Sequence, residues 1–164
     1  MAVYFRVCCV AHPARESPTH GDCTTLPPLI IAVVDANPAD VYIIARVLQA
    51  HGLQYTLQVL ESRQRALHFF DQLAAQDDVR CPDLLLLDDT LPGLDTRELL
   101  HWIKAVPVCR RLRIIVTTGS DDPAVQHAAF ALGADAFFHK PVSFQRFLAL
   151  GDLIKAMVYG YGQA

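Results

Sequence analysis

The sequence predicts an α/β fold in which a doubly wound parallel sheet carries helices on both faces. Short, continuous apolar runs recur along the chain, as expected of strands that are buried on both faces. Segments with helical spacing of apolar residues alternate with these runs, and alternation through short links is typical of parallel sheets. Apolar residues make up 52% of the 164 residues, which is enough for one buried core.

Five strands and five helices are expected in alternation. The strands are predicted at residues 29–34, 55–60, 83–87, 113–117 and 134–139. The helices are predicted at residues 41–52, 62–75, 95–105, 122–133 and 143–157. Glycines end the first and fourth helices, at Gly52 and Gly133, while Asp95 and the pair Asp122-Pro123 provide N-terminal caps.

The chain divides into three parts. Residues 1–28 hold four prolines and no sustained periodicity, so we interpret them as a flexible N-terminal extension. Residues 29–158 form the folded domain, and residues 159–164 are a short C-terminal tail.

Composition argues against several classes of protein. The net charge is −3 and no Lys/Arg cluster is present, which disfavours nucleic-acid binding. No apolar run reaches the length of a membrane span, and residues 3–11 lack the basic start of a signal peptide, so a cytoplasmic location is expected. The five cysteines form no C-x-x-C pair, so all five are interpreted as reduced thiols.

Polar side chains stand where the predicted strands end. Asp35 follows the first strand, Asp88 the third, Thr118 the fourth and Lys140 the fifth. The carboxyl ends of parallel strands converge at a common edge, where ligands bind in this kind of fold. A carboxylate can act as a nucleophile towards phosphorus, and phosphoryl transfer also needs a divalent cation and a fixed positive group. These four residues therefore predict a phosphoryl-transfer site.

Four stretches carry a resemblance to a known family. They are Ile-Ile-Ala-Val-Val-Asp-Ala-Asn-Pro-Ala-Asp (30–40), Pro-Asp-Leu-Leu-Leu-Leu-Asp-Asp-Thr-Leu-Pro-Gly-Leu-Asp (82–95), Val-Thr-Thr-Gly-Ser-Asp-Asp-Pro (116–123) and Leu-Gly-Ala-Asp-Ala-Phe-Phe-His-Lys-Pro (132–141). In order and spacing, the chain resembles the receiver domains of two-component response regulators, most of all the stand-alone regulators that work with phytochrome-type kinases. The resemblance implies a flavodoxin-like (βα)5 fold with strand order 2-1-3-4-5.

The resemblance also implies roles for individual residues. Asp88 matches the aspartate that accepts the phosphoryl group, Lys140 the lysine that pairs with it, and Thr118 the hydroxyl that reports its presence. Phe137 matches the aromatic residue that changes rotamer on activation, and the bond to Pro141 is usually cis in this family.

The resemblance also implies which proteins this chain interacts with and which surface binds its target. The implied function is a signalling switch, with at most self-catalysed phosphoryl transfer and dephosphorylation as enzymatic activity. A sensor histidine kinase or phosphotransfer protein would supply the phosphoryl group, and a downstream target protein would bind the surface of the fourth helix, fifth strand and fifth helix. The apolar stripe of the last helix is wide enough to serve a homodimer as well as the core.

The metal site departs from the family pattern at one position. Mg²⁺ would be held by Asp35 through water, by Asp88, and by the backbone carbonyl of Thr90. The family normally has a second acid after the first strand, as a direct ligand, but Ala36 stands there. Weak Mg²⁺ binding is therefore expected. The alternative is a pseudo-receiver, which would use the same fold to bind proteins without phosphorylation.

Overall fold

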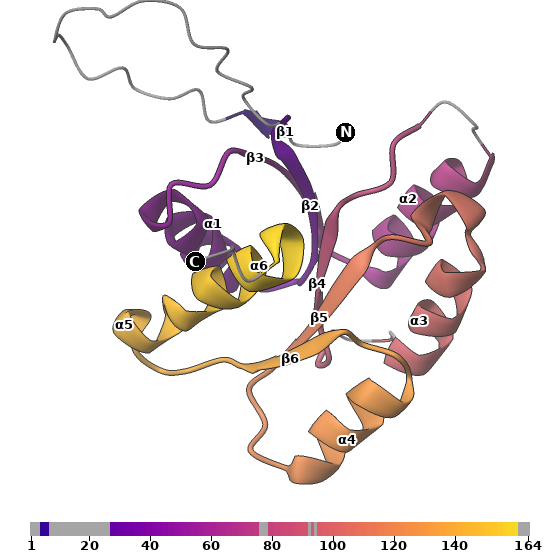
Figure 1. Ribbon diagram of the computed structural model, residues 1–164. Helices are drawn as coiled ribbons and strands as arrows, with labels where there is room; N and C mark the ends of the chain where they lie inside the picture. Colours follow the sequence, from indigo (N-terminus) through magenta and orange to yellow (C-terminus); the bar gives the residue numbers. More distant parts are fainter. Residues whose placement is uncertain (1–3, 7–26, 76–78, 92, 94, 161–164) are drawn as a thin grey trace, which may run out of the picture.

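The computed structural model describes residues 4–6, 27–75, 79–91, 93 and 95–160, which form a sheet with helices on both faces (Figure 1). The strands are β1 (Tyr4–Arg6), β2 (Leu29–Val34), β3 (Tyr55–Leu60), β4 (Leu84–Asp88), β5 (Arg113–Thr118) and β6 (Ala136–His139). The helices are α1 (Pro38–Ala50), α2 (Arg63–Ala75), α3 (Thr96–Ala105), the 3-10 turn η1 (Pro107–Cys109), α4 (Pro123–Ala131), α5 (Phe144–Phe147) and α6 (Ala149–Tyr159).

Five of the strands form the predicted parallel sheet. Its order is β3-β2-β4-β5-β6, which is the order 2-1-3-4-5 when the parallel strands are numbered along the chain. The central strands β2 and β4 pair with Ile31 opposite Leu84 and Val34 opposite Leu87. The flavodoxin-like fold is thereby confirmed, and β2 and β4 end side by side at the middle of the sheet.

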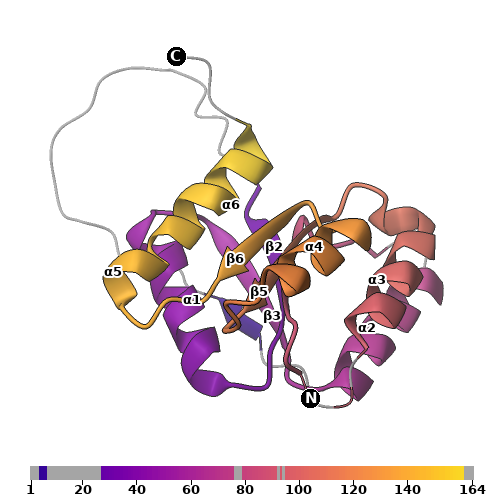
Figure 2. The same ribbon diagram turned by 90° about the horizontal axis from the view of Figure 1, so that it is seen from below.

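Two apolar clusters, one on each face of the sheet, explain the continuous apolar runs. Ile31 and Val33 of β2 pack with α1, α5 and α6, whereas Ala32 and Val34 pack with α2 and α3 on the opposite face. Figure 2 shows α1, α5 and α6 together on one side of the sheet and α2, α3 and α4 on the other. Because successive side chains of a strand point to opposite faces, a strand covered on both sides must be apolar at every position.

Local sequence fixes where the helices begin and end. Asn37 accepts a hydrogen bond from the backbone N–H of Ala39 and caps α1, while Asp95 caps α3 in the same manner, as predicted. Gly52 follows α1 with φ +65°, a conformation that favours glycine. The predicted last helix is divided at Leu148 into α5 and α6, a break that its periodicity did not reveal.

The structure corrects the prediction for part of the N-terminal extension. Tyr4–Arg6 forms β1, which pairs antiparallel with the edge strand β3, with Phe5 opposite Leu57. A three-residue edge strand is held by the strand beside it and needs no periodicity of its own, so the sequence pattern gave no sign of it. Residues 7–26, with Cys8, Cys9 and Cys23, lie outside the described residues.

Two further expectations are wrong. Cys81 and Cys109 form a disulfide with their Cα atoms 5.3 Å apart, so these two cysteines are not free thiols. They lie just before the neighbouring strands β4 and β5, which brings them together although 28 positions separate them.

The peptide bond before Pro141 is trans, the isomer that X–Pro bonds generally prefer. None of the helices in the described part of the chain has the length and apolarity of a membrane span.

Candidate functional site

The predicted site residues gather at the carboxyl edge of the sheet. Asp35 follows β2, Asp88 ends β4, Thr118 ends β5 and Lys140 follows β6, and these four strands are neighbours in the sheet. The Nζ atom of Lys140 lies 2.8 Å from Oδ2 of Asp35 and 2.8 Å from Oδ1 of Asp88. The topology thus brings together residues that are more than a hundred positions apart.

A third carboxylate, which the sequence analysis did not identify, completes this cluster. Oδ2 of Asp40, in the first turn of α1, lies 2.9 Å from Nζ of Lys140. Asp35 and Asp88 are buried and Asp40 is largely so. One ammonium group cannot neutralise three carboxylates, so the crevice keeps a net negative charge that attracts a further cation.

Burial and charge pull the pKa values of this cluster in different directions. Burial raises the pKa of Asp35, against the hydrogen bonds from Lys140 and from the backbone N–H of Asn37, which lower it. Burial lowers the pKa of Lys140, but its hydrogen bonds to Asp35, Asp88 and Asp40 outweigh this, and its pKa lies above the ordinary value. Lys140 therefore stays a cation at neutral pH.

Both oxygens of the Asp88 carboxylate have partners. Oδ1 accepts from Lys140 at 2.8 Å, and Oδ2 accepts from the hydroxyl of Thr90 at 2.7 Å. The sequence analysis gave Thr90 a backbone role only, so its side-chain hydrogen bond is an addition. Asp88 is 5% exposed, which leaves its carboxylate at the edge of a dry core but reachable from the crevice.

Asp89, which directly follows Asp88 in the sequence, is paired with a buried hydroxyl group. Its Oδ2 accepts a 2.8 Å hydrogen bond from the hydroxyl of Thr118, a side chain that is completely buried. Burial raises the pKa of Asp89, against the hydrogen bond from Thr118, and the nearby charge of Asp88 raises it further.

The predicted switch residue Phe137 lies on β6. Its side chain is half-buried and packs against the apolar cluster that includes residues of β5.

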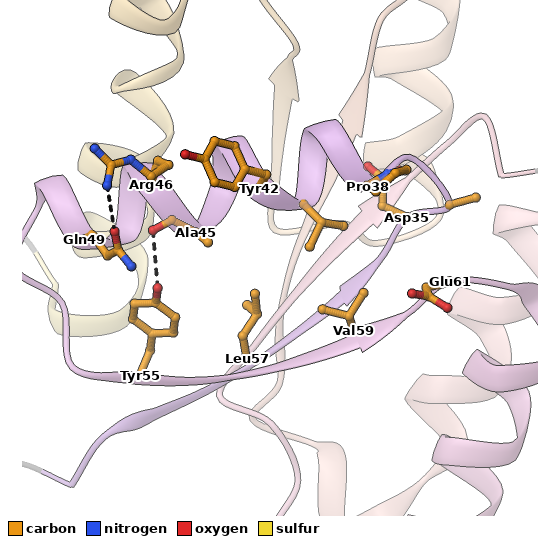
Figure 3. A pocket seen from close by; sticks show the side chains of 12 residues that line it. Asp35, Pro38, Tyr42, Ala45, Arg46, Gln49, Tyr55, Leu57, Val59 and Glu61 are labelled. Carbon is orange, nitrogen blue, oxygen red and sulfur yellow. Dashed lines mark hydrogen bonds between the residues drawn. The ribbon is translucent and has the colours of Figure 1, made fainter. Parts of the chain in front are cut away.

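Ala36 lines a cavity that opens next to the acidic cluster. The cavity has a volume of about 600 Å³ and lies between α1 and β3. Figure 3 shows Asp35 and Pro38 at one end and Tyr55 at the other, where its hydroxyl donates to the backbone carbonyl of Ala45 at 3.3 Å. The methyl group of Ala36 is exposed, so an acid at this position would have room.

The donor chemistry fits a hard cation only in part. Carboxylate and carbonyl oxygens are the ligands that Mg²⁺ prefers, and Asp35, Asp88 and the Thr90 carbonyl can supply them. Within the described ranges, however, no group of three or more His, Cys, Asp or Glu side chains is arranged to hold a metal. The Lys140 ammonium already contacts both acids, so a cation would have to compete with it.

Comparison with known proteins defines the class to which this fold and site belong. The model of the response regulator receiver domain family matches residues 31–151, and the chain therefore belongs to this family. The response regulator Rcp1 of Synechocystis sp. is 30% identical over 114 residues, which cover 70% of this chain and 78% of Rcp1. The probable methanogenesis regulatory protein FilR2 of Methanothrix harundinacea is 26% identical over 137 residues, covering 84% of this chain and 88% of FilR2.

Solved structures of phytochrome-type regulators share the fold. The phosphorylated cyanobacterial phytochrome response regulator RcpA superimposes with a TM-score of 0.70 at 22% identity, covering 84% of this chain and 98% of RcpA. The Mn²⁺-bound form of Rcp1 superimposes with a TM-score of 0.68 at 25% identity, covering 84% of this chain and 98% of that chain. The prediction that the chain resembles stand-alone phytochrome-type response regulators is thereby confirmed.

Proposed function

We propose that this protein is a two-component signalling switch that receives a phosphoryl group on Asp88. The donor would be a sensor histidine kinase or a phosphotransfer protein, and the signal would pass to a downstream target protein. One observation carries the proposal: a largely buried crevice holds the Asp88 carboxylate 2.8 Å from the Lys140 ammonium. A nucleophile and a fixed positive charge in contact are what phosphoryl transfer demands of a protein.

We assign the transfer step to Asp88 and Lys140. One carboxylate oxygen of Asp88 attacks the phosphorus of a phosphohistidine, the P–N bond breaks, and the departing imidazole nitrogen keeps the electron pair and takes up a proton. The product is an acyl phosphate on Asp88. Lys140, which is cationic here, pairs with the phosphoryl oxygens as charge gathers on them.

A divalent cation belongs to this proposal. Asp35, Asp88 and the backbone carbonyl of Thr90 would hold Mg²⁺, which neutralises the charge of the phosphoryl group when it is bound. Because Ala36 supplies no carboxylate and Lys140 occupies two of the acids, we infer that Mg²⁺ binds weakly. Phosphorylation from a small donor should then be slow at low metal concentration.

The proposed output runs along the surface of α4, β6 and the predicted fifth helix, which the structure divides into α5 and α6. Thr118 ends β5 directly beside β6, with Thr118 paired to His139 in the sheet register. Phe137 is two residues before His139 on the same strand. These elements carry exposed apolar side chains at Phe130 of α4, at Val142 after β6 and at Phe144 of α5, and such side chains suit a protein partner.

The second candidate function is that of a pseudo-receiver, and two features favour it: the missing carboxylate at Ala36 and the contacts of Lys140. Three carboxylates already engage Lys140, so the crevice is neutralised in part without any metal. A pseudo-receiver with this site would bind its partner without phosphorylation.

Phosphorylation by a small donor such as acetyl phosphate separates the two functions. Incubation with acetyl phosphate and excess Mg²⁺, followed by intact-protein mass spectrometry, should show one added phosphoryl group. Asp88→Asn should abolish it, whereas Asp95→Asn, which alters a remote helix cap, should leave it unchanged. If neither acetyl phosphate nor any kinase tried phosphorylates the wild-type protein, the switch is excluded and the pseudo-receiver stands.

A further inference from the structure

Asp89 and Thr118 form a pair that the transfer step does not use. The Thr118 hydroxyl donates to Oδ2 of Asp89 at 2.8 Å and accepts from the backbone N–H of Ser120 at 3.0 Å. A hydroxyl group has only one hydrogen to donate. In this structure that hydrogen is committed to Asp89, so the hydroxyl cannot also donate to an oxygen on Asp88.

Backbone hydrogen bonds hold the segments on either side of Thr118. The backbone N–H of Asp89 donates to the carbonyl of Thr117 at 3.0 Å, and the N–H of Lys140 donates to the carbonyl of Thr118 at 2.6 Å. These bonds tie the ends of β4, β5 and β6 together. Redirecting the Thr118 hydroxyl towards Asp88 therefore requires rotation of its side chain and loss of its bond to Asp89.

Breaking the hydrogen bond between Thr118 and Asp89 is energetically unfavourable for the Asp89 carboxylate. Its other oxygen, Oδ1, is buried and has no hydrogen-bond partner among the described residues. Without Thr118, neither oxygen of this half-buried carboxylate would have a side-chain partner, and unpaired buried carboxylates are unfavourable. The pair therefore favours the orientation of Thr118 seen here over any orientation in which the hydroxyl serves a group on Asp88.

We propose that Asp89 is a positioning residue that latches the Thr118 hydroxyl in the resting orientation. This inference rests on the proposed function, because the latch opposes the hydrogen bond that would report phosphorylation of Asp88. A ligand shifts such an equilibrium only by its differential interaction with the two states. Phosphorylation must supply enough interaction with Thr118 to replace the bond to Asp89, which sets a threshold for activation.

The first test uses the free protein and needs neither metal nor phosphoryl group. Three-bond NMR couplings report the side-chain rotamer of Thr118 in a threonine-labelled sample. The latch predicts one rotamer in the wild type and rotamer averaging in Asp89→Ala. Asp89→Asn keeps an acceptor oxygen and should retain the single rotamer. An unchanged Thr118 rotamer in Asp89→Ala would overturn the latch even if the protein proves to be a pseudo-receiver.

The second test measures binding of beryllofluoride, a mimic of the phosphoryl group, with excess Mg²⁺. Asp89→Ala should bind it about tenfold more tightly than the wild type, the size expected for a lost hydrogen bond to a charged group. Removing a negative charge near Asp88 could have the same effect, so the measurement is repeated in a Thr118→Val background.

The double-mutant cycle distinguishes the two causes. The latch predicts that Asp89→Ala gains most of its affinity only when Thr118 is present. An equal gain in the Thr118→Val background would show that charge alone is responsible and would overturn the latch. If beryllofluoride binds to none of the four proteins, the proposed function fails while the rotamer measurement still decides the latch.

Discussion

Lys140 is the only side chain of the described residues that contacts Asp35, Asp40 and Asp88 together, at 2.8 to 2.9 Å. The side chain of Lys140 is 12% exposed, and those of Asp35 and Asp88 are less exposed still. At this depth the interaction between unlike charges is much stronger than at the surface, and so is the repulsion among the acids. The stability of the crevice and its chemistry therefore depend on the same ammonium group.

Replacing Lys140 by methionine should destabilise the fold. Lys140→Met leaves three acids unpaired, and we expect the free energy of unfolding at pH 7 to fall by about 3 kcal/mol in urea denaturation. Burial raises the pKa of Asp35, so the folded variant would bind a proton at Asp35 more tightly than the unfolded chain does. The stability deficit should therefore shrink as the pH falls through the raised pKa of Asp35. Lys104→Met, at an exposed position, is the control. An equal, pH-independent loss in both variants would contradict this prediction.

Ala36 is the residue at which metal affinity should be most easily changed. Ala36→Asp restores a carboxylate beside Asp35, and Mg²⁺ should bind about tenfold more tightly or better, since about 1.4 kcal/mol corresponds to tenfold. Phosphorylation by acetyl phosphate should accelerate in parallel. Ala39→Asp adds the same charge at an exposed position of α1 and serves as the control in an NMR titration with Mg²⁺. If the wild type already binds Mg²⁺ as well as Ala36→Asp does, the missing ligand is unimportant.

For the residues of the site, the sequence predicted where they lie in the fold but not all of their side-chain contacts. Asp35, Asp88, Thr118 and Lys140 were predictable because strand ends in a parallel sheet converge. The contacts of Asp40 and Asp89 depend on side-chain directions in a helix turn and in the loop after β4, which residue type and spacing do not determine. The roles of Asp40 and Asp89 could therefore not be predicted from the sequence.

The contact between α1 and β3 contains a buried tyrosine. Tyr55 is 7% exposed, and its hydroxyl donates to the carbonyl of Ala45 in α1. Burial raises the pKa of this phenol above its usual value of 10.0, against a hydrogen bond with Gln49 that lowers it. The folded protein thus favours the neutral phenol more strongly than the unfolded chain does.

Alkaline titration should show this tyrosine separately. A raised folded-state pKa means that the stability contribution is fully present below about pH 10 and is lost as the pH rises through the folded value. Ultraviolet absorbance should detect one phenol that ionises above the usual pKa of 10.0. Tyr55→Phe should remove this late step. Simultaneous titration of all the tyrosines would contradict the burial argument.

The disulfide joins the starts of β4 and β5 at the edge of the sheet opposite the acidic crevice. Crosslinking residues 28 positions apart restricts the unfolded chain, and stabilisation of about 3 kcal/mol is expected for a loop of this size. Dithiothreitol should therefore lower the Tm of the wild type.

A variant without the crosslink provides the control. The double variant Cys81→Ala/Cys109→Ala should have a lower Tm that dithiothreitol does not change, although Cys8, Cys9 and Cys23 remain. An unchanged Tm of the wild type on reduction would contradict the contribution of the disulfide. Its formation could not be predicted from spacing, because only the pairing of β4 with β5 brings the two cysteines together.

Elements differed in how well the sequence predicted them, for physical reasons. Strands β2 and β4 were predictable because helices cover both of their faces and every position must be apolar. The predicted caps Asp95 and Asp122 mark helix starts by a local hydrogen bond, which residue type alone suggests. Strand β1 depends on its antiparallel pairing with β3, which is a tertiary contact and leaves no local pattern.

For the whole molecule, the two ends of the sheet have different tasks. The disulfide and the paired residues Arg113 and Asp135 lie at the starts of the strands, where they stabilise the fold. The acidic crevice lies at the opposite ends, beside the proposed latch of Asp89 and Thr118 and the proposed output surface of α4, β6, α5 and α6. Alternation of strands and helices predicted this division, since loops at the carboxyl ends of parallel strands form the binding site.

Binding of beryllofluoride with excess Mg²⁺, followed by two-dimensional NMR, tests whether Asp88 accepts a phosphoryl group. We predict saturable shift changes that begin at Asp88 and Lys140 and extend through Thr118 and Phe137 to α4. The same titration of Asp88→Ala should show none of them. Absence of binding by the wild type at saturating Mg²⁺, or shift changes confined to the opposite edge near the disulfide, would contradict the assignment of Asp88 as the phosphoryl acceptor.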